Sequence, residues 1–135
     1  MKLGAMLSDV TTSLFQHPVT ERYPFERREA PQRLRGLLQW DASKCVGCGL
    51  CAKDCPANAI EFTILDREAK QYVFAYHADR CAYCAQCVHS CRQGCLEMSN
   101  QEWELAALTK EPFLLYYGDP KNVELVMVGD VPEIA

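Results

Sequence analysis

The chain contains the same run of four cysteines twice. Two residues separate each of the first three cysteines, three residues precede the fourth, and the run recurs with the same spacing 36 positions later, from 45 to 81. The members are Cys45, Cys48, Cys51 and Cys55, then Cys81, Cys84, Cys87 and Cys91. This repeat predicts two pseudo-equivalent halves. We expect ligand binding at these thiols to be the folding event, because the core around them is small.

Cysteine usage and charge narrow the function classes. The chain has 135 residues and nine cysteines, all within residues 45–95. Its formal net charge of -4 disfavours a general nucleic-acid binder, which would usually be basic. Asp9 interrupts the first apolar run early, so we expect no signal peptide. An odd cysteine count in a reducing compartment points to metal or redox chemistry before disulfides.

The spacing within each run is that of bacterial ferredoxins with two [4Fe–4S] clusters. Three closely spaced thiolates wrap one cluster, and the fourth ligates the other cluster. The predicted ligands of cluster 1 are Cys45, Cys48, Cys51 and Cys91, and those of cluster 2 are Cys81, Cys84, Cys87 and Cys55. Structural zinc favours separated cysteine pairs, and disulfides would leave one thiol over, so both alternatives are disfavoured. Gly47 and Gly49 allow backbone N–H groups to turn toward cluster 1, whereas the second run lacks glycine.

Cys95 is the ninth cysteine and falls outside both runs. It is either an alternative ligand or redox group, or a small buried residue. The repeat aligns it with Ala59, a position that packs under the cluster. We favour the buried residue, because a free cysteine behaves there as a small apolar group.

The residues between the two runs predict an α+β fold. Residues 60–64 and 72–76 carry the alternation and the aromatic and β-branched residues of strands, and residues 66–70 form a polar turn. Residues 51–55 and 87–91 are expected as short helical turns. The predicted fold is a ferredoxin-like two-[4Fe–4S] domain with a pseudo-two-fold repeat over residues 41–100.

Two flanks extend beyond this domain. Within residues 1–40 we expect an amphipathic helix of about three to four turns, ended by Pro18, and then an extended, arginine-rich docking strap. The helix has its apolar positions at Leu3, Met6, Leu7, Val10 and Leu14. Residues 101–135 are expected to form a C-terminal docking extension. Its acidic end, residues 119–135, is interpreted as a strand added to a partner's sheet or as a disordered end.

Three segments give the chain a family resemblance. Residues 18–24, 31–36 and 45–60 resemble the two-cluster iron–sulfur subunit shared by complex I and the membrane-bound, energy-converting [NiFe] hydrogenases. Residues 81–87 and 96–106 lean toward the hydrogenase branch, and the likeness covers about residues 10–108. Family members usually carry a proline where this chain has Arg92, which bears on the geometry of cluster 1.

The resemblance implies an electron-transfer subunit with no catalytic residues of its own. Its partners would be hydrogenase-like small and large subunits and a membrane arm, with no nucleic acid and no direct small-molecule substrate. It would be peripheral, on the cytoplasmic side of the membrane, and held there by those subunits. An equivalent subunit of a complex I-like NADH or ferredoxin:quinone oxidoreductase and a diffusible two-cluster ferredoxin are the alternatives.

Overall fold

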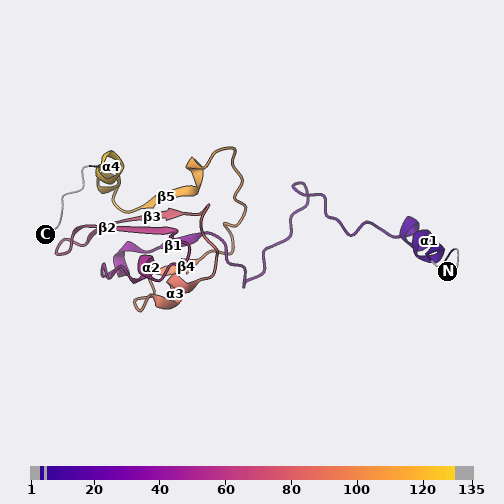
Figure 1. The fold of residues 1–135 in the computed structure, drawn as a ribbon, viewed down its shortest axis with the longest axis horizontal. Coiled ribbons are helices and arrows are strands. Elements are labelled where there is room, and N and C mark those ends of the chain that lie inside the picture. Colours follow the sequence, from indigo (N-terminus) through magenta and orange to yellow (C-terminus); the bar gives the residue numbers. More distant parts are fainter. Residues whose placement is uncertain (1–3, 5, 130–135) are drawn as a thin grey trace.

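A three-stranded antiparallel sheet forms one layer of the protein (Figure 1). The structure is a computed structural model and describes residue 4 and residues 6–129. The sheet has the order β2 (Ile60–Asp66), β3 (Gln71–His77) and β5 (Leu114–Tyr117). The two strands expected from sequence are confirmed, each a little longer than predicted, and residues 67–70 turn the chain between them. The predicted α+β class is confirmed.

The second layer carries the cysteines. It contains β1 (Leu38–Trp40) paired with β4 (Leu96–Met98), together with the short helices α2 (Leu50–Lys53) and α3 (Gln86–Ser90). α2 packs against α3 beneath the sheet (Figure 1). The expected helical turns are therefore present, each starting one residue before its predicted range. Two 3-10 turns, Ala42–Lys44 and Glu111–Phe113, lie in the connections between these strands and helices.

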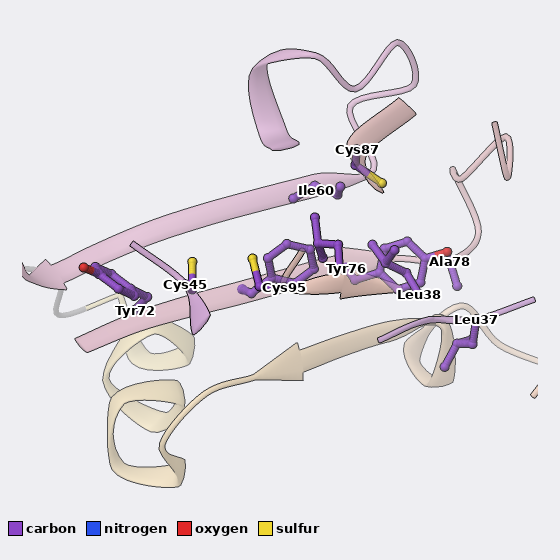
Figure 2. Close-up of a cluster of buried hydrophobic side chains, with 11 residues drawn as sticks. Leu37, Leu38, Cys45, Ile60, Tyr72, Tyr76, Ala78, Cys87 and Cys95 are labelled. Atoms are coloured by element: carbon purple, nitrogen blue, oxygen red, sulfur yellow. The ribbon is translucent and has the colours of Figure 1, made fainter. Parts of the chain in front are cut away.

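Aromatic side chains fill the space between the layers. Phe62, Phe74 and Tyr117 lie in register across the three strands, and the Trp40 ring stacks on Phe74 with centroids 5.5 Å apart. Tyr72, Phe74 and Tyr76 share one face of β3, because successive side chains of a strand alternate. All three are buried, and along this face the Tyr72 end lies near Cys45 and the Tyr76 end near Cys87 (Figure 2).

The N-terminal flank extends away from the two layers. Helix α1 (Leu7–Phe15) sits at the end of a long extended segment (Figure 1). It is shorter than the expected helix, and its predicted position Leu3 lies outside the described residues. Its apolar residues, among them Leu14 and Phe15, are exposed. No helix in residues 6–129 has the length and hydropathy needed to cross a membrane.

The C-terminal flank corrects one expectation. Pro120–Val128 forms helix α4, not a strand or a disordered segment; residues 130–135 lie outside the described range. Asp119 caps the helix, its carboxylate accepting from the Lys121 N–H at 3.1 Å, and Pro120 occupies the first turn. β5 meanwhile pairs with β3 of the same chain. The domain boundaries at residues 40 and 100 stay a prediction.

Candidate iron–sulfur site

The first loop, residues 45–51, needs left-handed backbone at two positions. Gly47 has φ 70° and Gly49 has φ 67°, values that glycine adopts without the clash a Cβ brings. At Gly47 there is a second constraint, since a Cβ would lie 2.6 Å from the Tyr72 ring. At Gly49 a Cβ would meet nothing within 4 Å. Tyr72 of β3 thus packs directly on the first loop.

The second loop, residues 81–87, adopts the same backbone without glycine. Tyr83 has φ 51° and Ala85 has φ 62°, and they correspond in the repeat to Gly47 and Gly49. The Tyr83 N–H donates to the Cys81 Sγ at 3.3 Å. The left-handed turn therefore aims a backbone donor at a predicted ligand, which is how backbone N–H groups tune iron–sulfur clusters.

The four cysteines predicted to bind cluster 2, called the second set from here on, surround one pocket. Cys55 comes from the end of the first run, and Cys81, Cys84 and Cys87 come from the second loop. The rest of the lining is mostly apolar and includes Leu38, Pro56, Ala59, Ile60, Tyr76, Ala85 and Met98. The Ala59 N–H donates to the Cys55 Sγ at 3.3 Å. The fold thus brings together the four residues predicted for cluster 2, including the one borrowed from the other half.

Burial governs the protonation of these thiols. Burial, together with the neighbouring thiols of Cys81 and Cys55, raises the pKa of Cys87 to about 11. An apolar pocket disfavours bare thiolates, and several thiolates together repel one another. Cluster iron relieves both penalties, because the ligands must be deprotonated and the iron supplies the compensating charge.

Three of the cysteines predicted to bind cluster 1, the first set, also lie near one another and are Cys45, Cys48 and Cys51. Burial raises the pKa of Cys51 to about 12, and the thiols of Cys45 and Cys48 add to the shift. Cys91 reaches this group through Cys95, whose Sγ is 3.1 Å from the Cys91 Sγ and which also neighbours Cys45. The assignment of Cys91 to cluster 1 remains a prediction.

Cys95 is buried, as expected for a small packed residue. Its contacts with two predicted ligands were not foreseen from sequence. Burial opposes the ionisation of Cys91, but hydrogen bonds from the Cys95 side chain and backbone outweigh burial and lower the Cys91 pKa. Burial, with the hydrogen bond to Cys91, raises the pKa of Cys95 itself. The two shifts together favour Cys91 as the acceptor and Cys95 as the donor of this contact.

The two sets of cysteines lie close together, but the thiols within each set are not aimed at one common point. Within the described residues, no three His, Cys, Asp or Glu side chains are close enough to hold one metal ion. The thiol of Cys87, in the second set, contributes to raising the pKa of Cys51, in the first. The two predicted cluster positions are therefore neighbours.

The pocket of the second set contains an unusual polar atom. The Tyr76 hydroxyl is buried and has no hydrogen-bond partner among the described residues. Burial raises the pKa of this phenol far above its ordinary value, and the neighbouring Cys81 thiol and Tyr83 phenol add to the shift. Because a buried donor is costly without an acceptor, the pocket fits a group rich in sulfur acceptors. Four thiols, an apolar wall and one free donor suit a [4Fe–4S] cluster.

One residue of the N-terminal strap also belongs to the site. The Arg35 guanidinium donates to the Cys84 carbonyl at 3.0 Å. Arg27 of the same strap pairs with Glu104 at 2.7 Å. The concentration of arginine in the strap was visible in the sequence, whereas the fold alone identifies Arg35 as the residue against the second loop.

Comparison with known proteins gives the class. Residues 44–95 match the family described as "4Fe-4S dicluster domain". The chain is therefore a ferredoxin-like protein that binds two [4Fe–4S] clusters, as the cysteine runs predicted.

Relatives that align over more of the chain identify the particular family. The chain is 37% identical over 108 residues to NADH-quinone oxidoreductase subunit I 2 of Geobacter metallireducens, an alignment that covers 75% of this chain and 82% of the relative. It is 30% identical over 134 residues to NAD(P)H-quinone oxidoreductase subunit I of Gloeobacter violaceus, covering 96% of this chain but 60% of that relative's length. The protein belongs to the NADH-quinone oxidoreductase subunit I family, which confirms the resemblance to the complex I subunit.

A solved structure shares the fold. The membrane-bound sulfane sulfur reductase, an archaeal respiratory membrane complex, contains a chain that aligns with a TM-score of 0.70 and 27% identity. The alignment covers 93% of this chain and 69% of that one. The similarity thus extends beyond the cysteine-rich residues 44–95 into the flanks.

Proposed function

We propose that this protein is an electron-transfer subunit that relays electrons through its two clusters within a larger oxidoreductase. The observation that carries the proposal is the adjacency of the two cysteine sets, with α2 packed on α3 and Cys51 next to Cys87. When bound, the clusters supply one-electron redox chemistry. The chain's own part is to hold the two sets side by side in a mostly apolar core.

We further propose the crossed set of ligands. Cluster 1 takes Cys45, Cys48, Cys51 and Cys91, and cluster 2 takes Cys81, Cys84, Cys87 and Cys55. The shared pocket of the second set supports the half that concerns Cys55. The contact chain from Cys91 through Cys95 to Cys45 supports the other half.

Serine variants test this crossing even when the EPR signals have not been assigned to individual clusters. Cys48→Ser and Cys91→Ser should weaken the same EPR signal of the reduced protein, because they remove ligands of one cluster. Cys84→Ser and Cys55→Ser should weaken the other signal. An uncrossed arrangement would instead group Cys55→Ser with Cys48→Ser, and that result would overturn the ligand assignment.

The host complex is proposed to be membrane-associated, with this chain peripheral on the cytoplasmic side and held by partner subunits. The resemblance of residues 81–87 and 96–106 supports an assembly like an energy-converting [NiFe] hydrogenase, with its small and large subunits and membrane arm. The names of the relatives support the alternative, a quinone oxidoreductase of the complex I type. The exposed apolar residues of α1 and the strap supply contact surface for either host.

Purification of the native assembly distinguishes these hosts. A nickel-binding large subunit in the purified complex would establish the hydrogenase-like host. Quinone-reducing subunits without nickel would establish the complex I-like host. Migration of the chain alone, as a small soluble monomer, would overturn the subunit proposal and favour a diffusible ferredoxin.

A further inference from the structure

The hydroxyl of Tyr76 is the feature that the proposed relay does not yet use. Tyr76 lies on β3, opposite Ile60 of β2 and Leu115 of β5, and its side chain is fully buried. Figure 2 shows its ring in the same cluster as Leu38, Ile60 and Cys87. The Oη atom is buried and lacks a hydrogen-bond partner within the described part of the chain.

A buried hydroxyl without a partner has lost its hydrogen bonds to water and gains none in return, which destabilises the fold. The position does not need this cost for packing, because the residue two places earlier on the same face is Phe74, equally buried. A phenylalanine at position 76 would fill nearly the same volume without the polar atom. The oxygen therefore requires an acceptor that occupies the pocket.

The cysteine sulfurs are most of the acceptors that this pocket offers. Tyr76 lines the pocket together with Cys55, Cys81, Cys84 and Cys87, and the Cys81 thiol is adjacent to the phenol. Among the other lining side chains Gln86 carries an oxygen acceptor and the rest are apolar, and the Tyr83 phenol, which neighbours the hydroxyl, lies outside this lining. Sulfur atoms of the cluster and of its thiolates are the acceptors available once the cluster is bound.

We propose that the Tyr76 Oη–H donates a hydrogen bond to a sulfur of cluster 2, either the Cys81 Sγ or a sulfide next to it, and so raises the reduction potential of that cluster. The inference rests on the proposed assignment of Cys55, Cys81, Cys84 and Cys87 to one cluster. Reduction adds negative charge to the sulfurs, and a donor stabilises the more negative state. Tyr76 is in this sense a positioning and tuning residue, not a ligand.

The first half of the repeat has no hydroxyl at the matching position. The position that corresponds to Tyr76, 36 residues earlier, is Trp40. Its ring stacks on Phe74, with the ring planes 13° from parallel. The hydroxyl therefore acts on one cluster of the two, and its removal should shift one potential and leave the other in place.

The test is Tyr76→Phe in the complete, anaerobically loaded chain, followed by redox titration monitored by EPR. At a fixed potential, the ratio of reduced to oxidised cluster 2 should fall about tenfold, equivalent to about 59 mV for a one-electron couple. Cluster 1 and the iron content should not change. In D2O-exchanged samples, one exchangeable site coupled to cluster 2, in addition to the amides of Tyr83 and Ala59, should be present in the unsubstituted protein and absent from the variant.

Tyr117→Phe is the matched control. It removes a hydroxyl that donates to the Leu38 carbonyl at 2.7 Å, so it should lower stability and leave both potentials unchanged. Unchanged potentials in Tyr76→Phe, or a shift in the cluster that survives in Cys55→Ser, would overturn the inference. Failure of the ligand assignment is distinguishable, because it would appear as a wrong grouping of the serine variants whatever Tyr76→Phe does.

Discussion

The first and second loops have the same backbone but reach it with different residues. Two left-handed positions in the first loop are glycines, and their counterparts in the second are Tyr83 and Ala85. A left-handed conformation costs an ordinary residue about 1–2 kcal/mol. The second loop tolerates this cost twice, which indicates that the cysteine arrangement, rather than local preference, dictates the turn.

The comparison also separates two reasons for a glycine. At Gly49 only the conformation favours glycine, because the space beside it is open. At Gly47 the Tyr72 ring occupies the place of a side chain. The corresponding Tyr83 places its own ring there, partly buried, and its phenol neighbours that of Tyr76. Equivalent backbone positions in a repeat thus diverge according to what the rest of the fold packs against them.

Removal of iron should have the largest effect and should abolish the similarity of the two loops. A chelator under reducing conditions is expected to unfold most of the chain, because three of the cysteines, Cys45, Cys87 and Cys95, are themselves part of the small core. NMR spectra should lose their dispersion and regain it when iron and sulfide are restored. A well-dispersed spectrum of the iron-free chain would show instead that the loops hold their turns unaided.

Gly47→Ala should have the next largest effect. The conformation costs about 1–2 kcal/mol, and the contact with Tyr72 adds about 1–3 kcal/mol of overpacking. Denaturant unfolding of the cluster-loaded protein measures the loss. Gly49→Ala is the matched control and should show the conformational part alone. Equal losses in the two variants would mean that the Tyr72 contact is not what requires glycine.

Cys95→Ala should have the smallest effect. It makes the second half resemble the first, where Ala59 stands at the corresponding position. We expect a loss of stability of about 1 kcal/mol, typical of a buried substitution, and full iron content by chemical analysis. Loss of one cluster's share of iron would contradict this and identify Cys95 as a ligand.

Local pattern predicted part of this fold well. Residues 60–64 and 72–76 alternate and are rich in β-branched and aromatic side chains, so their strands were predictable. β1 and β4 span three residues each, too few to show a period. The three valines at residues 123–128, with Leu125 and Met127, suggested a strand. The helix signals, Asp119 as the cap and Pro120 after it, lie just before this segment.

The candidate site likewise has a part that the sequence predicted and a part that only the structure shows. The cysteine spacing alone predicted the set that surrounds the pocket, because ligand spacing is a local property of the sequence. The roles of Tyr76 and Arg35 depend on segments far apart in sequence. Arg35 contacts the second loop at Cys84, which lies 49 residues further along the chain. No local pattern distinguishes such residues from others of their type.

The pairing of β5 with β3 has a consequence for how the folded chain meets other molecules. An uncovered edge of β3 would expose a row of free backbone donors and acceptors to other chains, and such edges are starting points for aggregation. In the folded protein, residues 114–117 cover most of that edge. The C-terminal segment thus acts as a guard strand, which keeps the aromatic centre of the sheet from joining a neighbouring molecule.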